Sequence, residues 1–293
     1  NGADYLPFTV AVKEFSPYVP INGVKWGKFN LQYTPGAKAD GWNGGYHLAK
    51  NPWDYFYTAR CSYPLTENVL REPLPSGDRN SVAFDHFRWG DIENAHNFSN
   101  GMGDNFWTST QDLKCQVSPD KKWGDIAYYA SNGKWAIPTA ADFNKLFDKT
   151  AEYIAYYKDD SGNIIYGAYF DSTVPDNLKG WIVDANGGKI RKINQSAAPI
   201  SRANLYRELK KSDFDTGVFF PMAGSYEYSG EMEKSGSLGG YWLATANPGN
   251  AAQAAAFYIA VHQNGQAFAG YTNSSMIPKR NMYSIRPIYI GND

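Results

Sequence analysis

The chain of 293 residues has only two cysteines, Cys61 and Cys115, and neither belongs to a Cys-x-x-Cys motif. Thiol redox catalysis and zinc binding by thiolates are therefore disfavoured. The two cysteines could form one disulfide in an oxidising compartment or stay two separate buried thiols, and the sequence leaves both open. The histidines lack the spacing of metal ligands, so we expect neither a metal nor another cofactor. They are His47, His86, His96 and His262.

The chain also lacks an excess of charge of either sign. Lys and Arg number 28 against 29 Asp and Glu, which gives a formal net charge of -1. No basic excess exists to attract nucleic acid or an anionic membrane, so neither is expected as a partner. The apolar runs are far shorter than the roughly 20 residues that cross a bilayer, so we expect no membrane-spanning segment. The chain opens at Asn1 without Met or a leader, which favours a mature or trimmed form of a longer precursor.

Aromatic residues are abundant instead and supply 16% of the chain, with 22 Tyr and 9 Trp. This composition is typical of a rigid fold rich in strands and turns, not of a helical bundle. The length fits one large domain or two small ones, and no repeat of roughly 20 to 50 residues is present. We predict one α+β domain over residues 1–293, in which 1–20 form an N-terminal strand or lead-in segment.

Three segments have the pattern of β-hairpins. The first, "EYIAYYKDDSGNIIYGAYF" (152–170), places turn residues between two β-rich runs. The second, "GWIVDANGGKIRKI" (180–193), turns at Asn186 to Gly188. The third, "AFYIAVHQNGQAFAGY" (256–271), has Asn264 and Gly265 at its tip. We therefore expect β structure to dominate the second half of the chain.

Two segments have helical patterns. In "IPTAADFNKLF" (137–147), Thr139 and Asp142 have the spacing of a capping box, which predicts a helix over 140–149. Three apolar residues fall on one face of that helix: Phe143, Leu146 and Phe147. A second, shorter helix is predicted over 201–211, because Leu205 and Leu209 are four positions apart and its last turn is basic.

The stretch from about 60 to 118 is dense in Pro, Gly, Asn and Asp and has little periodicity. We predict long ordered loops there, not a linker between domains. Four aromatic side chains are expected to hold these loops in place: Trp89, Phe98, Phe106 and Trp107.

Several segments resemble a known family when they are taken in order. They are "GVKWGKFNL" (23–31), "WGDIAYYASNGKWAIPTAADFNKLF" (123–147), "GVFFPMAGSYEYSGEMEKSGSLGGYWLATA" (217–246) and "YSIRPIYI" (283–290). The combination of W-x-x-P-T, YW-x-x-T and R-P is similar to the Fibrobacter succinogenes major paralogous domain, which belongs with the C-type-lectin-like and formylglycine-generating-enzyme-like folds. The resemblance spans nearly the whole chain.

The resemblance implies twisted antiparallel sheets with two short helices, long ordered loops, and N- and C-terminal strands that lie close together. It also implies a secreted or cell-surface bacterial protein, commonly an outer-membrane lipoprotein or a subunit of an adhesive appendage such as a fimbria. Related oxidising enzymes need a cysteine pair in the C-terminal core, but no Cys follows Cys115. Calcium-dependent lectins use Glu-Pro-Asn or Gln-Pro-Asp, whereas this chain has "EPL" (72–74) and "VPD" (174–176).

The same fold occurs in the variable proteins of diversity-generating retroelements, whose binding residues precede a closing S-x-R strand. The equivalent stretch here is about 241 to 283. Tyr provides rigid contact area and amides adapt their hydrogen bonds, although a plain polar hairpin would have the same composition. The candidate ligand-binding residues are Tyr241, Asn247, Asn250, His262, Gln263, Asn264, Gln266, Tyr271 and Asn273.

Within "GGYWLATANPGN" (239–250), side chains alternate along a strand, so Trp242 is expected in the core and Tyr241 on the outside. Arg286 is expected to anchor the last strand. As a function we expect non-catalytic recognition or adhesion, with a glycan or a surface protein as the ligand.

Two rival functions remain open. The first is a structural subunit of a surface appendage such as a fimbrial tip, which would bind other subunits. An unpaired segment over Tyr5 to Val19 would favour strand addition in that case. The second is an enzyme, either a hydrolase or an oxidase, in which Asp85 and His86 would need a nucleophile beside them.

Overall fold

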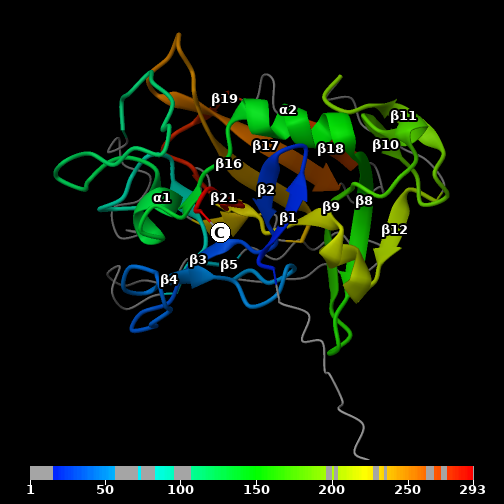
Figure 1. Ribbon diagram of the computed structural model, residues 1–293, viewed down its shortest axis with the longest axis horizontal. Coiled ribbons are helices and arrows are strands. Elements are labelled where there is room, and N and C mark those ends of the chain that lie inside the picture. The colour runs from blue at the N-terminus through cyan, green and yellow to red at the C-terminus, as the bar shows by residue number, and fades with distance from the viewer. Residues whose placement is uncertain are drawn as a thin grey trace, which may run out of the picture.

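The computed structural model describes residues 16–56, 72–73, 83–95, 107–195, 200, 204–226, 231–233, 236–261, 267–271 and 276–292 (Figure 1). These residues form five antiparallel or mixed β-sheets and two α-helices, which agrees with the predicted α+β class. Within this described part of the chain, no helix is long and apolar enough to cross a membrane.

Strands from the two ends of the described chain pair in one sheet, which we call the terminal sheet. Its order is β1-β2-β21-β7. Trp26 of β2 lies opposite Ile288 of β21, so the N- and C-terminal strands are close together, as expected. The strands are Tyr18–Ile21 (β1), Val24–Gly27 (β2), Ile288–Tyr289 (β21) and Trp135–Ala136 (β7).

Arg286 anchors the chain just before β21, as predicted. Its guanidinium is buried, and Nη2 donates to the carbonyl oxygens of Phe219 at 2.8 Å and Pro52 at 3.2 Å. Burial lowers the pKa of Arg286 to about 10. Its contacts therefore join the terminal sheet to two segments that are distant in sequence.

The large sheet has the order β11-β10-β8-β9-β13, and β12 also pairs with β8. It contains the first two predicted hairpins, β8–β9 and β10–β11, both of which are confirmed. Its strands are Ala151–Lys158 (β8), Ile164–Asp171 (β9), Trp181–Val183 (β10), Lys189–Lys192 (β11), Tyr206–Leu209 (β12) and Gly217–Pro221 (β13). Two short 3-10 helices flank them, Asp176–Leu178 and Lys211–Asp215.

The helix predicted over 201–211 is wrong where the structure describes it. Residues 206–209 form β12, which pairs in parallel with β8. Leu205 and Leu209 are both buried, but Leu205 lies just before the strand and the two side chains pack in different clusters of buried residues. Arg207 also fixes the strand, since its guanidinium lies 2.7 Å from Asp171 and 3.0 Å from Asp213.

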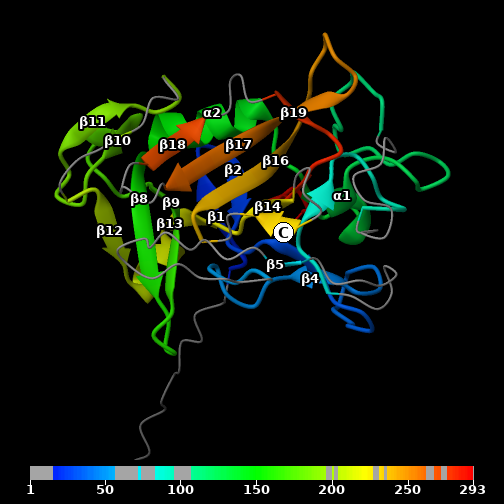
Figure 2. The ribbon, with the colours of Figure 1, turned by 180° about the vertical axis from the view of Figure 1, so that it is seen from behind.

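A third sheet, which we call the central sheet, consists of β16, β17 and β18 in that order, with β19 also paired to β17 (Figure 2). The third predicted hairpin is confirmed as β17–β18, although its tip at Asn264 lies outside the described residues. The strands are Leu238–Ala246 (β16), Gln253–Val261 (β17), Ala267–Tyr271 (β18) and Met276–Pro278 (β19).

Short strands form the two remaining sheets. One is the pair Leu31–Tyr33 (β3) and Tyr46–Leu48 (β4). The other has the order β5-β15-β14-β20-β6. Its strands are Glu72–Pro73 (β5), Glu231–Glu233 (β15), Ser225–Tyr226 (β14), Met282–Tyr283 (β20) and Phe87–Arg88 (β6).

The aromatic residues predicted to hold the 60–118 loops are described in part. Trp89 is buried and Trp107 is half-buried, and their rings stack with centroids 5.9 Å apart. Phe98 and Phe106 lie outside the described residues.

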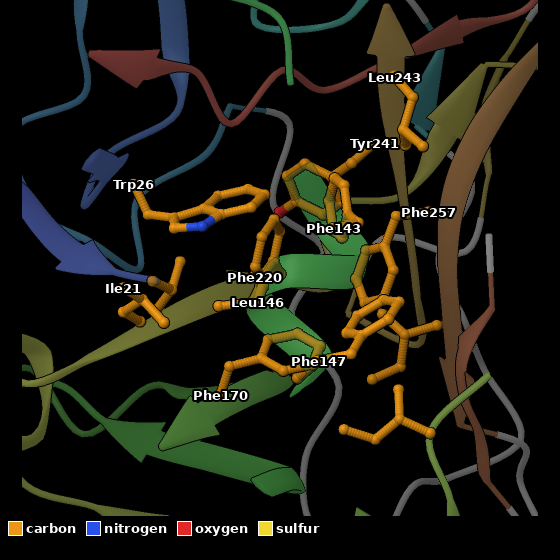
Figure 3. Close-up of a cluster of buried hydrophobic side chains, with 14 of the residues drawn as sticks. Ile21, Trp26, Phe143, Leu146, Phe147, Phe170, Phe220, Tyr241, Leu243 and Phe257 are labelled. Carbon is orange, nitrogen blue, oxygen red and sulfur yellow. The ribbon is translucent and has the colours of Figure 1, made fainter. Parts of the chain in front are cut away.

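Helix α2, Ala140–Lys149, has the predicted bounds and the predicted capping box of Thr139 and Asp142. Figure 3 shows its side chains packed between β2, β9, β13 and the central sheet. Phe143 lies 4.9 Å from Trp26 and 5.1 Å from Phe257, measured between ring centroids. The helix therefore fills the space where three sheets meet.

Helix α1, Ile126–Ala130, depends on one buried carboxylate. Asp125 Oδ1 accepts the backbone N–H groups of Ala127 and Tyr128, and Oδ2 accepts that of Ile137 at 3.0 Å. Burial raises the pKa of Asp125 to about 7, against the opposing effect of these three donors. Asp125 thus fastens α1 to the strand β7 that follows it.

Candidate functional site

The predicted ligand-binding residues are divided among different parts of the structure. Tyr241 lies in β16, and Asn247 and Asn250 lie in the turn between β16 and β17. Tyr271 ends β18, where the strand position alone is described. The others lie outside the described residues: His262, Gln263, Asn264, Gln266 and Asn273.

The prediction that Tyr241 faces outward is wrong. Its side chain is 1% exposed, and its hydroxyl donates to the carbonyl oxygen of Pro221 at 2.6 Å. Trp242 is also 1% exposed, in agreement with the prediction, and its Nε1 donates to the carbonyl oxygen of Phe87 at 2.6 Å. The two side chains do point to opposite faces of β16, but each face has its own hydrophobic core.

Glycine allows the close packing on one of these faces. A Cβ on Gly240 would lie 3.0 Å from ring atoms of Tyr283. The Tyr283 ring in turn packs on Trp242, with centroids 4.8 Å apart. The segment 239–246 therefore closes two cores and offers no binding surface of its own.

The turn that follows β16 is exposed and is organised by its own amide side chains. Asn247 Oδ1 accepts the N–H of Gly249 at 2.9 Å, and Asn247 Nδ2 donates to Gln253 Oε1 at 3.0 Å. Asn250 Oδ1 accepts the N–H of Ala252 at 3.0 Å. These bonds fix the backbone of the turn before any ligand arrives.

A second exposed segment, the loop at residues 108–111, lies beside this turn. The backbone N–H of Ala246 donates to Asp112 Oδ1 at 2.9 Å, and the N–H of Leu113 donates to the carbonyl oxygen of Ala244 at 2.9 Å. These bonds hold the loop against the end of β16. We call the exposed residues of the two segments the turn surface; they are Thr108, Thr110, Gln111, Pro248, Gly249 and Asn250.

Lys279 lies behind the turn surface and is completely buried. Its Nζ lies 3.9 Å from the centroid of the Trp89 ring and donates to the carbonyl oxygens of Trp107, at 3.2 Å, and Ser109. Its backbone N–H donates to the carbonyl oxygen of Ala252 at 2.9 Å. Burial lowers the pKa of the Lys279 ammonium to about 8. Lys279 thus holds the loop through its side chain and the turn through its backbone N–H.

The sequence analysis did not identify Lys279 as part of the site. A Lys next to Pro278 and Arg280 has the pattern of a solvent-exposed side chain. Its carbonyl partners Trp107 and Ser109 are 172 and 170 positions away, so no local spacing could have revealed the contact.

Among the described residues, the turn surface lies far from the end of β17 that precedes the hairpin tip. The turn surface joins the start of β17 at Gln253, whereas residues 262–266 follow its end at Val261. These ends are separated by the length of a strand, about 26 Å at roughly 3.3 Å per residue. The turn surface is therefore about the length of a strand away from Val261, the last described residue of β17.

A buried Asp, His and Ser are linked elsewhere in the structure. Asp85 Oδ1 lies 2.8 Å from His86 Nδ1, and His86 Nε2 lies 3.4 Å from both Ser284 Oγ and the carbonyl oxygen of Gly224. Asp85 Oδ2 accepts the N–H of Phe56 at 2.7 Å. This is the order of groups in a serine hydrolase. However, all three side chains are at most 1% exposed, so Ser284 cannot reach a substrate in this conformation.

Metal-binding groups and reactive thiols would be two other signs of chemistry in the described part of the chain. No group of His, Cys, Asp and Glu side chains there is arranged to hold a metal ion. His47 is engaged by Thr34 Oγ1 at 2.9 Å. Cys115 is a free thiol whose pKa is raised to about 11 by burial, while Cys61 lies outside the described residues.

Comparisons with known proteins give no match, since no family model, no curated protein and no solved structure is significantly similar to this chain.

Proposed function

We propose that this protein is a secreted or cell-surface bacterial module for recognition or adhesion, which binds a glycan or a protein ligand without catalysing a reaction on it. The fold proposed with it is C-type-lectin-like, which is finer than the α+β class. The paired terminal strands and the capped helix α2 support that fold, as does the resemblance of 123–147 and 217–246 to the family named above.

One observation carries the proposal. The turn surface is polar and exposed, yet its backbone is held by side-chain hydrogen bonds of Asn247 and Asn250 and by the buried ammonium of Lys279. A surface that is ordered before binding loses less conformational entropy when a ligand binds. Rigid support beneath a polar edge is the arrangement expected of a recognition site.

The test uses variants that block the surface without removing a described hydrogen bond. Pro248 has no N–H, and the side chain of Gln111 is exposed. Pro248→Arg and Gln111→Arg therefore add bulk where a ligand would dock. The matched control is Pro20→Arg, at an exposed position of the terminal sheet.

Wild type would be screened on glycan and protein arrays, and each hit would be measured again with the three variants by surface plasmon resonance. We expect both turn-surface variants to lose binding at an unchanged unfolding temperature, while Pro20→Arg binds as wild type does. A ligand that binds all three variants with equal affinity would refute the turn surface as the site.

A structural subunit of a surface appendage is the second candidate, because β1 is an edge strand of the terminal sheet. Val19 is paired with Trp26, so this end of the segment Tyr5 to Val19 is not unpaired. Pro20 within β1 lacks an N–H for an added strand, which weakens this edge as a docking site. Pull-down of neighbouring surface proteins equally by wild type and by both turn-surface variants would favour the subunit over the recognition module.

A further inference from the structure

The hairpin of β10 and β11 carries an indole ring with two ammonium groups over it. Trp181 of β10 lies directly opposite Lys192 of β11 in the strand register. Lys192 Nζ lies 4.4 Å from the centroid of the indole, and Lys189 Nζ lies 4.9 Å from it. Trp181 is half-buried and both lysines are exposed. We call these three residues the Trp181 platform.

The core sets the position of the indole. Trp181 packs against the cluster of buried side chains that includes Tyr153, Tyr157 and Val183 of the large sheet. The lysines come from the neighbouring strand β11, and their long stems leave their charged ends in solvent. The ring is therefore a fixed element and the two ammonium groups are adjustable ones.

The hairpin is basic although the whole chain is not. The segment 179–192, "KGWIVDANGGKIRK", has four cations and one acid, a formal charge of +3 in a chain of net charge -1. The acid is Asp184, whose Oδ1 accepts the N–H groups of Asn186 and Gly188 within the turn. Lys179 forms an ion pair with Asp176 at 2.6 Å. Two of the four cations, Lys189 and Lys192, lie beside the ring.

Two ammonium groups at one indole attract the ring but repel each other. An anionic group placed between them would relieve the repulsion and accept charge-assisted hydrogen bonds from both. The exposed part of the indole would then contact an apolar face of the same ligand. An acidic saccharide offers both features, since its ring has C–H faces and carries a carboxylate or sulfate.

We propose that the Trp181 platform is a binding site for an acidic saccharide. Trp181 contacts the sugar ring, and Lys189 and Lys192 bind its anionic group. In both Figure 1 and Figure 2, β10 and β11 lie on the opposite side of the molecule from the turn between β16 and β17. The inference therefore does not rest on the turn surface, and either site can fail without the other.

The experiment is isothermal titration calorimetry with a galacturonic acid oligosaccharide, a neutral maltooligosaccharide of the same length, and inorganic sulfate. The variants are Trp181→Ala and the double variant Lys189→Gln with Lys192→Gln. The matched control is Lys38→Gln with Lys50→Gln, two exposed lysines elsewhere. The turn-surface variant Pro248→Arg separates the two proposed sites.

We expect the acidic oligosaccharide to bind more tightly than the neutral one and more weakly at high salt. Each platform variant should weaken the acidic ligand by about tenfold or more. The control and Pro248→Arg should bind as wild type does. The double lysine variant keeps the test decisive if Trp181→Ala fails to fold.

Three results would overturn the inference. The first is no binding of the acidic oligosaccharide by wild type, and the second is an unchanged Kd in the double lysine variant. The third is sulfate alone binding as tightly as the oligosaccharide, which would mean a simple anion site without sugar recognition.

Discussion

The buried ammonium of Lys279 should make stability depend on pH in an unusual direction. The unfolded chain keeps the proton of this side chain up to a pKa of about 10.4. The native protein releases it near pH 8, because burial lowers the pKa to about 8. Between these values the unfolded state binds more protons, so this group makes the free energy of unfolding rise as the pH rises.

The size of the effect follows from the two pKa values. From about pH 7.5 to about pH 9.5, Lys279 should raise the free energy of unfolding by about 2 kcal/mol. Lys279→Met removes the titrating group and keeps a chain of similar length over the Trp89 ring. It also removes the donor to Trp107 and Ser109, which lowers stability at every pH by about 1 to 3 kcal/mol.

The assay is urea denaturation followed by far-ultraviolet circular dichroism at several pH values between these limits. The quantity of interest is the difference between wild type and Lys279→Met, since other titrating groups cancel in it. Lys38→Met, at an exposed lysine, is the control and should leave the pH profile unchanged. Parallel profiles for wild type and Lys279→Met would show that this ammonium has an ordinary pKa and refute the reasoning.

Three further predictions concern the buried structure. Gly240→Ala should lower the free energy of unfolding by about 1 to 3 kcal/mol, because its Cβ meets the Tyr283 ring. Gly249→Ala is the control and should leave the free energy of unfolding nearly unchanged. Equal losses of stability in the two variants, measured by chemical denaturation, would contradict this explanation. A fluorophosphonate probe should leave Ser284 unlabelled in the native protein, whereas labelling found by mass spectrometry would support the hydrolase alternative. Asp125 has a raised pKa of about 7, so the native state binds more protons between about pH 4 and that value. Its contribution to stability should therefore decline as the pH rises through this window, and Asp125→Asn should abolish the decline in pH-dependent denaturation.

Local signals in the sequence predicted local structure well. Helix α2 has the bounds that its capping residues Thr139 and Asp142 indicate. The turn residues placed the hairpins β8–β9 and β10–β11 correctly, because backbone conformation at a turn depends on a few adjacent residues. Residues 248–250 of the polar turn are exposed, as its composition indicates.

The candidate site was predictable only where it is local. Asn247 and Asn250 are in the turn surface, but the supporting Lys279 is connected to residues about 170 positions away. The link between His86 and Ser284 spans 198 positions. The Trp181 platform depends on the register of β10 against β11, which brings Lys192 opposite the indole. Such contacts follow from strand pairing and leave no spacing pattern in the chain.

By itself the sequence determined which short segments turn, which form hairpins, and where α2 begins and ends. Only the tertiary structure decided which faces are buried. Leu205 and Leu209 fit a helix equally well, but pairing with β8 made 206–209 a strand. Tyr241 alternates with Trp242 as the pattern indicates, yet both are buried because the central sheet has a core on each side. Burial depends on what packs against a face, and that partner comes from distant parts of the chain.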